Sequence, residues 1–268
     1  MDVKGKVIVV TGGGNGMGRE VVLGLLARGA AVAAADMSKE GLAETAELAK
    51  APEGRLSTHV LNVTDRDAVL KFPAAVEKAH GQVDGLVNVA GIIQKFVKIS
   101  DLSFEEIERV MNVNFWGVVN MTKAFLPTLL ERPEASVVNV SSMGGFLPVP
   151  GQATYGASKA AVKLFTEALY AETRGTNLAV TVVFPGGVGT NITANSGVDI
   201  PNMGEVEQGK ARKVVSPADA GRQIIEGLEK GAYRVLIGSD AKMMDKLSRL
   251  MPRKATELIA KQMKSLLG

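Results

Sequence analysis

Two side chains that can act together in acid–base catalysis lie four residues apart. Tyr155 and Lys159 belong to a helix predicted over Thr154–Thr173, so both lie on one face of it, one turn apart. A phenol with a pKa of about 10 is a poor acid–base catalyst at neutral pH. An ammonium about 4 Å away favours the phenolate by about 4 kcal/mol at an effective dielectric constant of about 20. The pair therefore predicts a tyrosine activated by a lysine, although Tyr-x-x-x-Lys also occurs by chance in many helices.

Two further polar residues are candidates for the same site. Ser142 lies thirteen residues before Tyr155, directly after a predicted strand. Neighbouring strand residues point to opposite faces, so Ser141 and Ser142 cannot both face one pocket, and Ser142 is the better candidate. Asn114 interrupts a long helix predicted over Phe104–Leu130. It is either a polar residue that faces solvent or a group that bends the helix at the site.

A glycine-rich turn follows the first predicted strand, which reads KVIVVT. Gly12, Gly16 and Gly18 have the spacing G-x-x-x-G-x-G. Glycine permits positive φ angles and a close backbone approach, so free amides at the start of the next helix can face a pyrophosphate. Asp36 ends the second predicted strand, 18 residues after Gly18. A carboxylate there accepts hydrogen bonds from both hydroxyls of an adenosine ribose and repels a 2′-phosphate. The alternatives are a tight turn without a ligand and a surface carboxylate.

The elements that must position these residues alternate between strand and helix. The predicted strands are Lys6–Thr11, Ala31–Ala35, Leu56–Leu61, Gly85–Val89, Ser136–Ser141, Ala179–Phe184 and Arg234–Ile237. The predicted helices are Met17–Leu26, Lys39–Lys50, Asp65–Ala79, Phe104–Leu130, Thr154–Thr173 and one that starts at Ser216. Strands joined by helical crossovers form a parallel sheet covered on both faces. The sequence therefore predicts a single-domain, Rossmann-like, doubly wound α/β fold with seven strands.

The domain is expected to cover residues 1–239 and to hold both the dinucleotide and the catalytic site, since no linker or repeat interrupts the alternation. Residues 188–214 break the alternation with a segment rich in Asn, Gly and charge, which predicts a helical lid. Residues 240–268 form a C-terminal tail of the same domain, with helical periodicity on both sides of Pro252. The residues Asn88–Gly91 (NVAG) at a strand end have small side chains, which leave room for a cofactor against the backbone. The alternative is an ordinary loop.

The tail carries two apolar stripes with basic residues on the opposite faces. One stripe is Met243, Met244, Leu247, Leu250 and Met251, and the other is Leu258, Ile259, Met263, Leu266 and Leu267. Methionine-rich stripes pack on their own protein or a neighbouring subunit, whereas basic amphipathic helices also lie on anionic membranes. We expect the tail to cover the substrate cleft or an interface, with contact to a membrane surface as the alternative.

Composition excludes several classes of protein. The 268 residues are 46% hydrophobic and 22% charged, as in ordinary globular proteins, and contain no cysteine. That absence excludes disulfides, thiolate metal sites and a cysteine nucleophile, and we expect no metal site. No apolar run approaches the roughly 20 residues that span a bilayer, and no secretory leader is evident, so we expect a soluble, cytoplasmic protein. The whole basic excess lies in the tail and aromatic residues are only 4%, which argues against a nucleic-acid partner.

The combination of TGGGNGMG, NVAG, Asn114, Ser142, YGASK and Pro185-Gly186 resembles the classical short-chain dehydrogenase/reductase family over at least residues 3–238. In that family the serine binds the substrate carbonyl, the tyrosine is the general acid/base, and the asparagine supports a proton-relay water. The lysine lowers the pKa of the tyrosine and holds the nicotinamide ribose. The resemblance therefore implies four catalytic residues, which are Asn114, Ser142, Tyr155 and Lys159.

The same resemblance implies a set of contacts to NAD. These are Gly12, Asn15, Gly16, Met17, Gly18, Asp36, Asn62, Val63, Asn88, Ala90, Gly91, Tyr155, Lys159, Pro185, Gly186, Val188 and Thr190. Pro185, Gly186 and Thr190 would line the nicotinamide side. The chain departs from the family at Asn62-Val63, where Asp-Val is common. Asparagine still offers an amide to the adenine ring but lacks the carboxylate.

These observations predict an NAD(H)-dependent oxidoreductase that interconverts a secondary alcohol and a ketone. A hydrophobic small-molecule substrate is expected from the apolar segment Met143–Pro150 and from Ile192, Val198, Ile200 and Met203 of the lid, unless these residues pack the fold or a subunit contact. The resemblance also implies a homodimer or homotetramer that pairs the helices over Phe104–Leu130 and Thr154–Thr173.

Two alternatives stay open. An NADPH-dependent ketone or 3-oxoacyl reductase of the same family needs a basic residue in the glycine loop or after the second strand, and Asn15, Met37 and Ser38 are not basic. A non-catalytic nucleotide-binding regulator on this fold often loses the tyrosine or the lysine. This chain keeps all four catalytic residues.

Overall fold

The computed structural model describes residues 1–190, 192–198 and 214–263, and their centre is a sheet of seven parallel strands in the order β3-β2-β1-β4-β5-β6-β7. The strands are β1 Val7–Thr11, β2 Ala31–Asp36, β3 Leu56–Val60, β4 Gly85–Asn88, β5 Ala135–Val140, β6 Leu178–Pro185 and β7 Arg234–Ile237. The order reverses between β1 and β4, where ligands bind outside the carboxyl ends of strands in open α/β sheets. The predicted Rossmann-like doubly wound sheet is confirmed.

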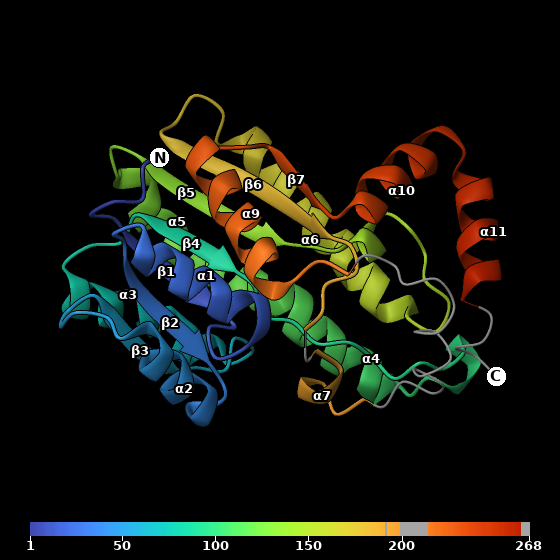
Figure 1. Cartoon of the computed structure of the whole chain (residues 1–268), viewed down its shortest axis with the longest axis horizontal. Helices are drawn as coiled ribbons and strands as arrows, with labels where there is room; N and C mark the ends of the chain where they lie inside the picture. Colours follow the sequence, from blue (N-terminus) through green and yellow to red (C-terminus); the bar gives the residue numbers. More distant parts are fainter. Residues whose placement is uncertain (191, 199–213, 264–268) are drawn as a thin grey trace.

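Helices cover both faces of the sheet. One face carries α1 Gly16–Ala27, α2 Lys39–Ala49 and α9 Pro217–Lys230, and the other carries α3 Arg66–His80, α5 Gly117–Glu131 and α6 Ala153–Glu172. In Figure 1, α1 and α9 lie in front of the sheet and α5 and α6 behind it. Because the strands are buried on both faces, their near-continuous Val, Ile and Ala sequences follow directly from the layer order.

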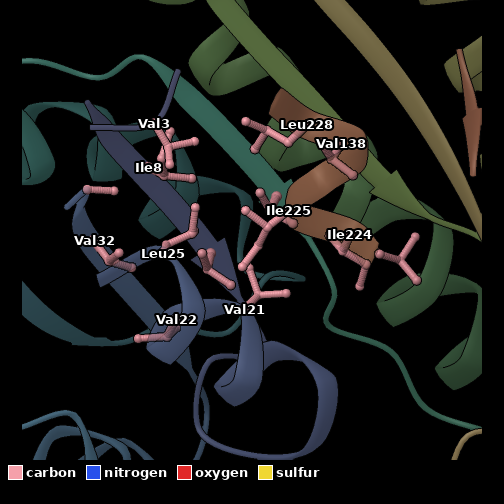
Figure 2. Packing of buried hydrophobic residues seen from close by; sticks show 14 of the residues in the cluster. Val3, Ile8, Val21, Val22, Leu25, Val32, Val138, Ile224, Ile225 and Leu228 are labelled. Carbon is pink, nitrogen blue, oxygen red and sulfur yellow. The ribbon is translucent and has the colours of Figure 1, made fainter. Parts of the chain in front are cut away.

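The core beneath α1 and α9 holds the glycine turn in place. Figure 2 shows Val21 and Leu25 of α1 packed with Ile225 of α9, and all three side chains are at most 1% exposed. A Cβ atom at Gly24 would lie 2.6 Å from the Cδ1 atom of Ile225, so the lack of a side chain at Gly24 makes room for the end of the Ile225 side chain. This packing fixes the axis of α1, and with it the direction in which the first amides of α1 point.

The helix predicted over Phe104–Leu130 is interrupted by a π-helical turn. It runs as α4 Phe104–Met111, the π-helical turn η2 Asn112–Trp116, and α5, after a short 3-10 helix η1 at Ile99–Asp101. The predicted polar interruption Asn114 lies in the middle of the π-helical turn and is fully buried. Single π-helical turns inside α-helices are frequent at functional sites.

Short elements and the tail gather beyond the carboxyl ends of the strands (Figure 1). They are the 3-10 helix η3 Met143–Gly145, α7 Ile192–Asn195, α10 Ser239–Leu250 and α11 Pro252–Gln262. Of the predicted lid and tail residues, Ile200, Met203, Leu266 and Leu267 lie outside the described residues. Nowhere in the described ranges is there a helix both long and apolar enough to cross a lipid bilayer.

The tail packs against the loop that follows Ser142. Met244 of α10 and Ala255 and Ile259 of α11 form a small buried cluster with Leu147, and the partly buried Met143 packs against it. The other side of the predicted stripes is exposed, at Met243, Leu250, Met251 and Leu258. About half of each described stripe therefore packs on the protein's own catalytic loop.

Candidate active site

The glycine turn brings backbone groups close together at the start of α1. Gly12 and Gly16 have φ angles of 72° and 51°, in the left-handed region that favours glycine. A Cβ atom at Gly18 would collide with the carbonyl oxygen of Gly12. The Asn15 side chain accepts a hydrogen bond from the Gly16 amide at 2.6 Å and caps α1, and Met17 packs partly buried against the core. The turn therefore needs its glycines for reasons of geometry alone.

Asp36 lies beside this turn at the end of β2. Its two carboxylate oxygens accept hydrogen bonds from the amides of Gly14 and Ser38, each at 2.9 Å. A carboxylate has about four acceptor positions, so both oxygens can still accept from a ligand. The cation on α1, Arg19, donates to the Gly14 carbonyl and to Glu44 at 2.6 Å. Arg19 is thus held by the protein itself rather than directed at Asp36.

The predicted adenine residues follow β3. Asn62 is exposed, and its Oδ1 atom accepts hydrogen bonds from the amide and the hydroxyl of Thr64 at 3.0 and 2.8 Å. Val63 is buried, and its carbonyl accepts a hydrogen bond from Asn120 of α5. A Cβ atom at Gly117 would lie 2.6 Å from Val63, so α5 packs tightly on this segment.

The end of β4 joins the glycine turn to the catalytic helix. The hydroxyl of Thr11 accepts hydrogen bonds from the amides of Val89 and Ala90, and a Cβ atom at Gly12 would lie 3.0 Å from the Ala90 nitrogen. At Gly91 a Cβ atom would lie 3.1 Å from the Nζ atom of Lys159. Backbone from β1 and β4 and the side chain of Lys159 therefore meet at one edge of the sheet.

The side chain of Asn88 points into the protein. It is 2% exposed and donates a hydrogen bond at 2.9 Å to Asn139 of the neighbouring strand β5, which in turn donates to Thr166 of α6. The Oδ1 atom of Asn88 is buried without a hydrogen-bond partner. The structure therefore places the amide of this residue between strands, and only its backbone at the strand end lies next to Ala90 and Gly91.

Ser142 lies beside Tyr155, and Ser141 points to the opposite side, as expected for neighbouring residues of an extended chain. The Ser142 hydroxyl lies beside the Tyr155 side chain, since both groups lie against Gly144, and it accepts a hydrogen bond from the amide of Gly144 at 3.0 Å. The hydroxyl of Ser141 points the other way and donates to the carbonyl of Lys159 at 2.7 Å. A Cβ atom at Gly144 would lie 3.4 Å from the Tyr155 ring, so this glycine keeps the space beside the phenol open.

Burial dominates the acid–base properties of the pair on α6. It raises the pKa of the Tyr155 phenol, and the nearby Ser142 hydroxyl offsets part of that rise. It also lowers the pKa of Lys159 to about 8. The sequence predicts a Tyr155 pKa lowered by the neighbouring ammonium, and in this structure the shift is in the opposite direction. The pKa of Tyr155 is raised because burial removes water from the charged phenolate. The Lys159 ammonium donates a hydrogen bond to the carbonyl of Val140 at 3.0 Å.

Asn114 holds the loop after β4. Its Oδ1 atom accepts from the amide of Ile92 at 2.8 Å, and its Nδ2 atom donates to the carbonyl of Ile92 at 2.9 Å and to the hydroxyl of Ser158 at 3.0 Å. Ser158 in turn donates to the carbonyl of Tyr155. Of the two interpretations that the sequence leaves open, the buried group in a distorted helix is the one observed.

The segment after β6 closes the site from the other side. Pro185 is buried at the end of β6, and the amide of Gly186 donates to Ile237 of β7. Val188 pairs with Val215 in a parallel bridge. The side chain of Thr190 lies next to Gly16, at 3.5 Å from where a Cβ atom would be. The side chain of Thr190 therefore lies against the glycine turn.

Two residues of this region were not predicted. Gln94, fully buried after β4, accepts hydrogen bonds from the first amides of α6. Asp240 of α10 accepts from the amide of Gly187 at 2.9 Å and so links the tail to the segment after β6. The only sequence signal for Gln94 is a single uncharged polar residue after the apolar pair II, which is weak evidence for any role.

Comparisons with known proteins agree with this geometry. The family model described as short chain dehydrogenase matches residues 6–200. The chain is 40% identical over 263 residues to a Mycobacterium tuberculosis protein named as an oxidoreductase, SadH, covering 96% of this chain and 95% of that protein.

Solved structures share the fold. One is a short-chain dehydrogenase/reductase from Burkholderia phymatum in complex with NAD, with a TM-score of 0.82, 24% identity, and coverage of 93% of this chain and 96% of that one. Another is a short chain dehydrogenase from Burkholderia cenocepacia in complex with NADP, with a TM-score of 0.80, 25% identity, and coverage of 97% and 99%. The chain belongs to the classical short-chain dehydrogenase/reductase family, whose members are nucleotide-binding oxidoreductases.

Proposed function

We propose that this protein is an NAD(H)-dependent oxidoreductase that interconverts a secondary alcohol and a ketone on a hydrophobic small molecule. The observation that carries the proposal is that Ser142 and Tyr155 lie side by side against Gly144, with Lys159 one turn along the same helix as Tyr155. A phenol and a hydroxyl in contact can share one substrate oxygen between them, which is what proton transfer to a ketone requires.

The residues at the sheet edge fit a dinucleotide. The Gly12 and Gly18 positions leave no room for a side chain, so a pyrophosphate could come close to the backbone at the start of α1. The Asp36 carboxylate would accept from the ribose hydroxyls, and Lys159 would hold the nicotinamide ribose. When bound, the nicotinamide supplies or accepts the hydride.

The chain's own residues supply the proton. Tyr155 donates its phenol proton to the ketone oxygen in reduction and takes the hydroxyl proton in oxidation, while Ser142 donates a hydrogen bond to that same oxygen. Asn114 keeps the neighbouring backbone in place, and Gly91 leaves room for the Lys159 side chain. While it is protonated, Lys159 would place a cation near the reacting oxygen. The raised pKa of Tyr155 keeps the phenol protonated at neutral pH, which is the form that ketone reduction uses.

Support for NAD over NADP comes from Asp36 and Arg19. A carboxylate at Asp36 repels a 2′-phosphate, and Arg19, the cation on α1 nearest to the glycine turn in sequence, is engaged with Gly14 and Glu44. Support for a hydrophobic substrate comes from Met143 and Phe146, apolar residues of the segment after Ser142 whose side chains stay partly exposed. Val198 of the predicted lid is 5% exposed and packs in the fold, so it adds no support.

The proposed homodimer or homotetramer is supported by exposed apolar side chains on the two helices that the resemblance implicates. They are Phe104, Trp116 and Leu130 in the α4–α5 region and Leu164 on α6. A cytoplasmic location and a domain of residues 1–239 with residues 240–268 as its tail complete the proposal.

A panel of secondary alcohols and ketones, with NAD(H) and NADP(H) in parallel, tests the proposed function. Turnover is read from the absorbance band of the reduced nicotinamide. We expect turnover with apolar cyclic or chain substrates and NAD(H). Activity confined to NADP(H), or binding of NADH without turnover of any member, would instead favour the alternative reductase or the regulator.

The raised pKa of Tyr155 predicts opposite pH dependences for alcohol oxidation and ketone reduction. Oxidation needs the phenolate, and burial raises the pKa of Tyr155, so alcohol oxidation should speed up as the pH rises above neutrality. Ketone reduction needs the protonated phenol and should not speed up over the same range. Initial rates in both directions between pH 6 and about 10 measure this. A flat oxidation profile would contradict the assignment of Tyr155 as the acid/base.

Truncation of the tail tests its contact with the catalytic loop. Deleting Pro252–Gly268 removes Ala255 and Ile259 from the cluster that holds Leu147, so we expect a raised substrate KM or a changed oligomer with nearly unchanged affinity for NAD. Steady-state kinetics and light scattering measure the two outcomes. Ile259→Ser should have the same effect, whereas Leu258→Ser, on the exposed side, should have none. If the truncated protein keeps its kinetics and assembly but loses binding to anionic vesicles, the membrane interpretation is correct.

A further inference from the structure

We propose that Gln94 is a positioning residue that holds Tyr155 in its catalytic place by capping the start of α6 from a different part of the chain. The inference rests on the proposed function, since it concerns how Tyr155 is held for proton transfer. Gln94 lies 61 residues before Tyr155 in the sequence and has no exposed surface.

The side chain of Gln94 makes three hydrogen bonds at the start of α6. Its Oε1 atom accepts hydrogen bonds from the amides of Thr154 at 2.7 Å and Tyr155 at 3.1 Å, and its Nε2 atom donates to the carbonyl of Gly151 at 3.0 Å. Gln152 donates to the backbone carbonyl of Gln94 at 2.8 Å. One buried amide side chain thus forms hydrogen bonds both with the first turn of the helix and with the turn that leads into it.

The helix has no side-chain cap of its own. Gln152 occupies the N-cap position of α6, and its side chain makes no capping hydrogen bond. The first amides of a helix lack intrahelical partners, and buried amides without partners are costly. Gln94 therefore caps the start of α6 from a distance. At α9 the cap is local: the hydroxyl of Ser216, the N-cap residue, accepts a hydrogen bond from the amide of Asp219 at 3.0 Å.

The loop that carries Gln94 is itself held at successive residues. The amide and carbonyl of Ile92 bond Asn114, and the amide of Ile93 donates to Ser196, next to α7, at 2.9 Å. Arg109 also donates to the carbonyl of Ile93. A residue on a loop held in this way can fix the helix, rather than follow it.

Tyr155 is placed where this cap matters. It is the third residue of α6, so its backbone position depends on the first turn being helical, and its phenol must lie beside Ser142, which follows β5. Loss of the cap would free the first turn and move the phenol relative to Ser142. A displacement on the order of 1 Å at a reacting group lowers the rate on the order of 10²-fold.

The test compares Gln94→Met, which keeps the size but removes both polar atoms, with Gln94→Glu, which keeps an oxygen for the two amides. For Gln94→Met we expect kcat to fall on the order of 10²-fold, with the Kd for NADH within about twofold of the unmutated protein. Gln94→Glu should recover about tenfold or more of that loss. Ser216→Ala, which removes the cap of α9 on the opposite face of the sheet, is the control and should leave kcat within about twofold.

A double-variant comparison separates positioning from general stability. If Gln94 acts through Tyr155, adding Gln94→Met to Tyr155→Phe should not lower the residual rate further. Equal losses in both backgrounds, or a kcat for Gln94→Met equal to that of the Ser216→Ala control, would overturn the inference.

Hydrogen exchange keeps the result distinct from the fate of the proposed function. The amides of Thr154 and Tyr155 should exchange at least about tenfold faster in Gln94→Met than in the unmutated protein. If they do, and the unmutated protein reduces no ketone, the proposed function fails while the cap stands. If exchange at these amides is unchanged, the cap is refuted whatever the enzyme's activity.

Discussion

Tyr155→Phe is expected to lower kcat by about 10²- to 10⁴-fold while the Kd for NADH stays within about twofold. The substitution removes one oxygen, the one that transfers the substrate proton in the proposed mechanism. The ring remains, so its packing beside Gly144 is kept. Tyr155 is only one of the expected NAD contacts and the others at the sheet edge are unchanged, so cofactor binding should persist. Stopped-flow kinetics and fluorescence titration of NADH measure the two quantities.

Tyr170→Phe is the matched control for this substitution. Tyr170 is on the same helix, and its hydroxyl accepts a hydrogen bond from Arg174 at the surface. The same atom is therefore removed away from Ser142, and kcat should not change. If Tyr155→Phe keeps more than about a tenth of the unmutated kcat, another group transfers the proton and the assignment of Tyr155 is wrong.

The second large effect is expected at the cofactor. The unmutated protein should prefer NAD to NADP by on the order of 10²-fold in kcat/KM, because placing a phosphate beside the Asp36 carboxylate costs several kcal/mol. Asp36→Ala with Met37→Arg should narrow or invert the preference by removing the repulsion and adding a phosphate partner. Met37 is 64% exposed, so an arginine there meets no packed neighbour.

Single substitutions identify which part of the change matters. Asp36→Asn keeps an oxygen for the amide of Gly14 but has no charge, so it should relieve the repulsion with little damage to the glycine turn. Met37→Arg alone should improve NADP less than the pair does. Steady-state kinetics with each cofactor give the ratio. Equal kcat/KM for NAD and NADP in the unmutated protein would show that Asp36 does not face the ribose.

Local sequence patterns predicted the fold well because the elements that define it are local. The β-branched strands and glycine turn lie in short stretches, and all seven strands formed within a few residues of their predicted limits. Ser142 could be preferred over Ser141 because strand geometry separates neighbours by face, and the structure directs Ser142 to Tyr155.

Contacts between distant segments were not predictable in this way. The bond between Gln94 and the start of α6 spans 60 residues, and nothing in the local sequence indicates it. The direction of the Tyr155 pKa shift depends on how deeply the phenol is buried, which spacing along a helix does not give. The side chain of Asn88 turns to Asn139, a partner that becomes a neighbour only when β4 and β5 pair.

The tail illustrates the same limit. Its helical periodicity predicted two helices divided at Pro252, and both α10 and α11 are present. Periodicity does not say which half of an apolar stripe finds a partner, and Met244 and Ile259 are buried while Met243 and Leu258 are exposed. Their common partner, Leu147, lies in the loop after Ser142, about a hundred residues earlier in the chain.

Transfer of deuterium from cofactor to substrate tests the central claim most directly. The unmutated protein is incubated with NADH carrying deuterium at C4 of the nicotinamide and with a ketone that it reduces. We predict that the deuterium appears on the carbinol carbon of the alcohol product, and that Tyr155→Phe suppresses product formation without releasing the cofactor. An alcohol product without deuterium on that carbon from either face of the labelled cofactor, or full transfer by Tyr155→Phe, would contradict the proposed hydride transfer assisted by Tyr155.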